Sequence, residues 1–254
     1  MNNIIEPRDF IHPLDRSLSA QIMNFPVLKQ LMDIVFDEKL DSVNSYFFQS
    51  SCILFPEKHP VTAALRDGEK FFNIGEKLQA YSIHSYDFDV KIIGYNHPVV
   101  LVSSRLLEEN NGFLLRERVA TAAAAVNAGH HKLDFLLWIY DNFSGIIRLP
   151  VLNIALTGLI NEWKRSRQYT LDRAFLLYTN NFELSKKNIL YGQIPYSIFK
   201  TFNFKHDDTF QDQVNAFYKK DDILKLATTI QSILQYEIWI PSRYKELCDF
   251  CKGV

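Results

Sequence analysis

Glycine is scarce in this sequence, and neither sign of charge dominates. The chain has 9 glycines in 254 residues, about half the usual share of roughly 7%. It carries 28 Lys+Arg against 29 Asp+Glu, a formal net charge of -1, which gives no electrostatic reason to expect nucleic acid or an anionic membrane as a partner. Hydrophobic residues make up 47% of the chain, which excludes disorder as its main state.

The sequence also lacks a long hydrophobic run. Its most apolar segments are Ala120–Ala128, Phe135–Tyr140 and Ile146–Ile160, and each is too short to cross a bilayer. The first residues show no basic segment followed by an apolar one, so no secretory signal is expected. We therefore expect no membrane insertion.

Cysteine is rare as well, and Cys52, Cys248 and Cys251 do not make a disulfide framework. This usage predicts a reducing compartment and a cytoplasmic location. Cys248 and Cys251 have the CxxC spacing that can serve redox or metal chemistry. No second CxxC and no βαβ pattern accompany them, so we interpret them as ordinary cysteines of a C-terminal helix.

Aromatic residues are plentiful, with 20 Phe and 12 Tyr, and no repeat or low-complexity linker divides the chain. We predict one domain, residues 1–254. Apolar spacing predicts a helix from Pro13 to about Ile34, another over Val61–Phe72, and helices throughout the part after residue 112. Short apolar or alternating runs predict strands at Ala80–His84, Phe88–Ile93 and Val99–Ser103. The fold class is α+β, mostly helical, with a small sheet around residues 80–104.

One predicted helix, Val119–His130, is unusually rich in alanine. Small side chains let neighbouring backbones approach closely, so we expect a central, tightly surrounded helix. It carries two polar residues, Asn127 and His130, which need hydrogen-bonding partners if they are buried.

Several motifs occur in a fixed order along the chain. They are Pro13-Leu14-Asp15-Arg16, Asp89–Gly94, Pro98–Ser104, Val126-Asn127-Ala128-Gly129-His130, the segment from Trp163 to Leu177 with Arg165, Gln168-Tyr169 and Asp172-Arg173-Ala174, and Arg243-Tyr244-Lys245-Glu246-Leu247. In this order they resemble the HtpX-like zinc metalloendopeptidases, the gluzincin family that includes the CAAX prenyl endopeptidases. The resemblance implies a zincin-like metallopeptidase fold.

In that family, an HExxH helix holds zinc with two histidines, its glutamate is the general base, and a glutamate on a second helix is the third ligand. The resemblance places Val126 and His130 at the two histidines, Asn127 at the base and Gln168 at the third ligand. Only His130 retains its type. Catalytic zinc needs three protein ligands, so we expect no metal, no cofactor and a degenerate zinc site.

The resemblance also assigns three supporting residues around the former metal. Asp172 stands where a carboxylate orients a zinc histidine, and without that histidine it is free to pair with Arg173, Lys164 or another base. Arg243 stands at the family's C-terminal arginine, and Glu237 replaces a histidine that stabilises the transition state. Asp89-Val90-Lys91 replaces the Asn-Ala-Phe of the substrate-facing strand.

We therefore expect a pseudoenzyme that binds a peptide or protein partner without zinc-dependent hydrolysis. The expected peptide-binding edge strand is Val99, Val100, Leu101, Val102 and Ser103, through β-augmentation. Three alternatives stay open: a closed cleft with the function on another surface, a structural subunit, and an enzyme. The enzyme is either a residual metalloendopeptidase or a new activity of the remodelled cleft that uses His130.

Overall fold

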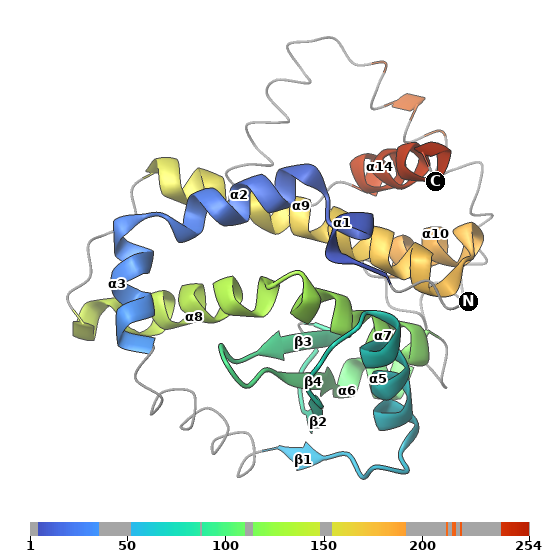
Figure 1. Cartoon of the computed structure of the whole chain (residues 1–254). Coiled ribbons are helices and arrows are strands. Elements are labelled where there is room, and N and C mark those ends of the chain that lie inside the picture. Colours follow the sequence, from blue (N-terminus) through green and yellow to red (C-terminus); the bar gives the residue numbers. More distant parts are fainter. Residues whose placement is uncertain are drawn as a thin grey trace.

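The computed structural model describes residues 5–35, 52–86, 88–109, 114–147, 154–191 and 240–253, together with residues 212, 215, 216 and 219. Within these residues, the fold is α+β and mostly helical, with one four-stranded sheet (Figure 1). Among the described residues, no helix is both long enough and apolar enough to span a bilayer. The elements are α1 (Pro7–Phe10), α2 (Pro13–Met23), α3 (Pro26–Val35), β1 (Ile53–Leu54), α5 (Pro60–Phe71), β2 (Gln79–Ile83), β3 (Val90–Ile93), β4 (Val99–Ser103), α6 (Ser104–Glu109), α7 (Leu115–Asn127), α8 (His130–Ile147), α9 (Ile154–Thr179), α10 (Phe182–Tyr191) and α14 (Ile240–Gly253).

Histidine–proline pairs begin two of these helices. His12 and His59 each precede a proline at the first helical position, and each ring accepts a hydrogen bond from a backbone N–H of the first turn. Proline suits this position because its missing N–H would have no partner inside the helix. The prediction of one helix from Pro13 to about Ile34 is wrong, because α2 ends at Met23 and Pro26 begins α3.

The sheet has the strand order β1-β2-β4-β3. β4 pairs with β2 in parallel and with β3 in antiparallel orientation, so it is a central strand and all five of its residues are buried. The prediction that Val99–Ser103 is an edge strand is therefore wrong. Its continuous apolar sequence is typical of a strand covered on both faces. Among the strands that the structure describes, β1 and β3 lie at the two edges of the sheet.

The alanine-rich segment is a central helix, as predicted, and α5 crosses it closely. A Cβ atom added at Gly68 of α5 would lie 2.1 Å from the carbonyl oxygen of Ala120 on α7. Ala120, Ala123 and Ala124 are fully buried. Small residues on both helices therefore set the distance between α5 and α7.

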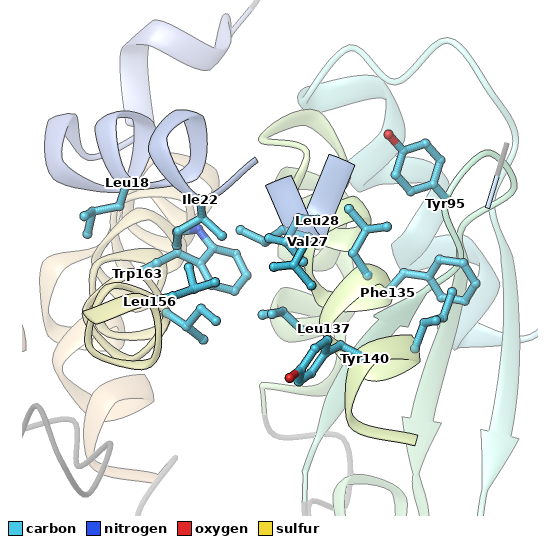
Figure 2. Packing of buried hydrophobic residues seen from close by; sticks show 14 residues of the cluster. Leu18, Ile22, Val27, Leu28, Tyr95, Phe135, Leu137, Tyr140, Leu156 and Trp163 are labelled. Carbon is cyan, nitrogen blue, oxygen red and sulfur yellow. The ribbon is translucent and has the colours of Figure 1, made fainter. Parts of the chain in front are cut away.

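Two apolar clusters hold the sheet and the long helices together. One joins α5, α7 and a face of the sheet, and includes Val61, Val100 and Val126. The other joins α2, α3, α8 and α9, and Figure 2 shows Trp163 of α9 beside Ile22 of α2. Trp163 is fully buried, so the segment that carries the family resemblance is anchored in this second core.

Candidate functional site

The helix that carries Val126 and Asn127 ends before it reaches His130. α7 ends at Asn127, Gly129 has a φ of +74°, and α8 begins at His130. A glycine in the left-handed region is a common way to end a helix, because it lacks the Cβ that would strain this conformation. The prediction of a single helix over Val119–His130 is wrong at its end. Val126 and His130 consequently do not share one continuous helix face.

Val126 and Asn127 make structural contacts instead of facing a shared site. Val126 is buried in the apolar cluster with Val100 and Ile92 of the sheet. The side-chain amide of Asn127 donates through Nδ2 to the backbone oxygen of Phe72, at 2.7 Å. Phe72 is the C-terminal cap residue of α5, so Asn127 ties the end of α5 to the end of α7.

His130 is buried and pairs with a carboxylate from the N-terminal part of the chain. Its Nε2 lies 2.7 Å from Asp15 Oδ2, and the two residues are 2% and 1% exposed. Asp15 also accepts hydrogen bonds from the hydroxyls of Thr170, at 2.5 Å, and Ser19, at 3.3 Å. Burial by itself raises the pKa of Asp15, but the hydrogen bond with His130 and those from the two hydroxyls outweigh this effect and hold the pKa below its usual value.

Asp172 and Arg243 form a second buried pair. Arg243 Nε donates to Asp172 Oδ2 at 2.8 Å, and Nη2 donates to Oδ1 at 2.6 Å. Gln168 adds a longer hydrogen bond from its Nε2 to Asp172 Oδ1, at 3.4 Å. The sequence left open Arg173, Lys164 or another base as the partner of Asp172, and the structure shows Arg243 in this role. Glu237, the third supporting residue of the sequence prediction, lies outside the described residues.

A pocket of about 670 Å³ lies beside these residues. His130, Gln168 and Arg243 line it, whereas Val126 and Asn127 are not among its lining residues. Strand β3 and the residues before it, Phe88–Ile92, form one wall. The sequence-predicted site is therefore brought together only in part, and it includes β3 in place of β4.

The charged residues of the pocket are mostly arranged in ion pairs. Arg118 pairs with Asp89 and also donates from Nε to Asn188 Oδ1 at 2.8 Å. Arg167 Nη1 lies 2.5 Å from both carboxylate oxygens of Asp134. These pairs join the residue before β3 to α7, and α8 to α9, so they fix the walls of the pocket relative to one another.

His131 also lines the pocket, and it is 4% exposed. Burial and the charge of Lys132 lower its pKa to about 4, although contacts with the backbone of Ala125 and Tyr95 oppose this shift. His131 is consequently neutral at physiological pH.

For two residues of the site, Asp15 and Arg118, the sequence contains no indication that they belong to it. Asp15 was recognised only as part of a helix start, and it lies 115 residues from its partner His130. Arg118 stands 29 residues from Asp89 and was not singled out. Tertiary packing brings the partners of such pairs together. The spacing of apolar residues within one helix does not indicate which distant residue will be the partner.

No group of three or more His, Cys, Asp or Glu side chains that could hold a metal ion occurs among the described residues. No protein-family model, curated protein or solved structure matches the chain. The relation to the HtpX-like peptidases thus remains a resemblance carried by the sequence motifs.

Proposed function

We propose that this protein is a pseudoenzyme with a metallopeptidase-like fold, and that it binds an extended peptide or protein segment in the pocket beside β3. Binding occurs by addition of a strand to the β3 edge, without zinc-dependent hydrolysis. The observation that carries the proposal is that β3 is both an edge strand and a wall of the pocket.

The backbone of β3 offers hydrogen-bonding groups on its outer side. Ser103 N donates to Asp89 O at 3.0 Å, and Lys91 stands opposite Leu101 in the same register. Hydrogen-bonded and non-hydrogen-bonded pairs alternate along an antiparallel ladder. Val90 and Ile92 therefore direct their N–H and C=O groups away from β4, where the described part of the chain places no further strand. These groups are the ones that an added strand would pair with.

The donor set at the former zinc positions does not suit the metal. Val126 has no lone pair and lies in an apolar cluster, and the amide of Gln168 already donates to Asp172. His130 has its Nε2 hydrogen-bonded to Asp15. These residues do not supply the three ligands of a catalytic zinc site, and Asn127 has no basic group to accept a proton from water.

The test is a screen of arrayed short peptides against the purified protein, followed by affinity measurement for the best binder. We compare Val90→Pro with Val90→Ala. Proline at the first residue of an edge strand removes the outward N–H and leaves the ladder to β4 intact, whereas alanine keeps the N–H. We expect Val90→Pro to weaken binding at least about tenfold and Val90→Ala to weaken it little.

Circular dichroism and thermal unfolding establish that both variants fold. Equal affinity of Val90→Pro and Val90→Ala would exclude strand addition at β3. Peptide cleavage that depends on added zinc would instead support the rival proposal of a residual metalloendopeptidase.

A further inference from the structure

The Nδ1 atom of His130 is buried and has no hydrogen-bonding partner among the residues that the structure describes. The other ring nitrogen, Nε2, is engaged with Asp15. The ring lies edge-on to Trp163, with 6.1 Å between ring centroids. His130 is also a lining residue of the pocket beside β3. A buried polar atom without a partner destabilises the folded state, so this nitrogen calls for an explanation.

The pairing of His130 Nε2 with Asp15 determines whether His130 Nδ1 can donate or accept a hydrogen bond. Thr170 and Ser19 donate their hydroxyls to Asp15, which is consistent with an ionised carboxylate that acts only as an acceptor. In the neutral imidazole, the proton then resides on Nε2 and points at Asp15. Nδ1 consequently carries the lone pair and is a hydrogen-bond acceptor.

The contacts of Asp15 also hold the ring in place. Asp15 and Ser19 belong to α2, His130 begins α8, and Thr170 lies in the middle of α9. Thr170 in addition accepts a hydrogen bond from the backbone N–H of His12, at 3.0 Å. Three helices therefore orient one imidazole, as carboxylate partners do for functional histidines elsewhere.

The charges that line the pocket favour some hydrogen-bond donors over others as the ligand group that binds His130 Nδ1. The described lining residues include more cationic than acidic side chains: Lys91, Arg118, Lys164, Arg167 and Arg243 against Asp89, Asp134 and Asp141. Such surroundings disfavour an ammonium group. A neutral N–H donor fits better, and an extended peptide carries one at almost every residue.

We propose that His130 Nδ1 accepts a hydrogen bond from one backbone N–H of the bound peptide, with Asp15 as the positioning residue. This assignment rests on the proposed function, because it names a contact within the same pocket. It gives His130 a role in recognition that requires no metal.

The experiment is a double-mutant cycle between the protein and the peptide. Each backbone N–H of the best-binding peptide is methylated in turn, and its affinity is measured with the wild type and with His130→Gln. Glutamine keeps an N–H donor for Asp15 but has no acceptor at the place of Nδ1. We expect one methylated position to lose roughly tenfold in affinity with the wild type and to lose little with His130→Gln.

A second measurement uses only the wild type, so it does not depend on the stability of His130→Gln. In the wild type labelled with ¹⁵N-histidine, we expect an unprotonated His130 Nδ1 whose resonance shifts when the peptide binds. A purely structural histidine would give neither the coupling nor this shift.

The two proposals fail in different ways. If Val90→Pro weakens binding but no methylated position couples to His130, strand addition stands and the role of His130 is excluded. A protonated Nδ1 in the free protein would exclude it as well. If no peptide in the screen binds the wild type, both proposals are overturned.

Discussion

Asp172 on α9 and Arg243 on α14 form a bidentate ion pair across 71 residues of sequence, with N···O distances of 2.6 and 2.8 Å. Both side chains are almost completely buried, at 3% and 5% exposure. Two parallel N–H···O bonds fix the relative orientation of the guanidinium and the carboxylate. The pair therefore joins the C-terminal helix to the segment that carries the strongest motif of the sequence.

Removal of one partner of this pair should destabilise the protein strongly. We expect Arg243→Met to lower the free energy of unfolding by about 3–5 kcal/mol, because it leaves the carboxylate of Asp172 buried without its counter-charge. Urea denaturation measures the change. The control is Lys252→Ala on the same helix, whose pair with Asp249 is exposed and should contribute less than about 1 kcal/mol. Similar losses in the two variants would contradict the interpretation.

The stability of the protein should fall in acid partly because of His131. Its pKa is about 4 in the folded protein, against 6.5 for the unperturbed group. The unfolded chain therefore binds this proton more readily, and stability is lost as pH falls from about 6.5 to about 4. The expected contribution is on the order of 3 kcal/mol.

The measurement is the free energy of unfolding of the wild type and of His131→Gln across this pH range. Glutamine does not titrate, so its curve should lack the corresponding part of the decline. The carboxylates titrate in both proteins and cancel in the comparison. Parallel curves for the two proteins would rule out a neutral buried His131.

The crossing of α5 and α7 should not tolerate a methyl group at Gly68. A Cβ there would lie 2.1 Å from the backbone oxygen of Ala120, and backbone cannot move aside as a flexible side chain can. We expect Gly68→Ala to lower the free energy of unfolding by about 1–3 kcal/mol. Gly75→Ala is the matched control, because no atom lies within 4 Å of its added Cβ. An equally mild effect of both substitutions would show that the helices can separate at little cost.

Zinc should have no effect on stability if the donor set is as degenerate as the side chains indicate. A ligand that binds only the folded state raises the unfolding temperature. We expect the same melting temperature after dialysis against EDTA and after addition of equimolar zinc. Elemental analysis of the purified protein provides the second measurement. A melting temperature raised by zinc, together with stoichiometric metal, would show that other residues complete a site.

Much of the secondary structure was predictable because it depends on local patterns. The helix over Val61–Phe72, the three strands between Ala80 and Ser103, and the alanine-rich helix were all predicted close to their observed bounds. The errors within helices occurred at their ends, and strand β1 was not predicted. Pro26 and Gly129 each separate two helices whose apolar spacing continues across the break, and spacing alone does not show such a break.

The candidate site was predictable only in part. His130, Gln168 and Arg243 were named from the sequence and do line one pocket. Val126 and Asn127 were named with them but pack elsewhere, because α7 ends before His130. The partner of His130, Asp15, comes from a distant helix, so no motif spacing connects the two residues.

The sequence by itself determined the α+β class, the buried alanine-rich helix and the residue types at the positions that the resemblance compares with zinc ligands. These follow from side-chain periodicity and from the chemistry of single residues, which do not require long-range contacts. Only the tertiary structure decided that β3 rather than β4 is the edge strand, and that Asp15 orients His130. The physical reason is that strand neighbours and buried ion pairs form only when distant segments of the chain pack together. Hydrophobic burial favours this packing, but no local sequence pattern shows which segments will become neighbours.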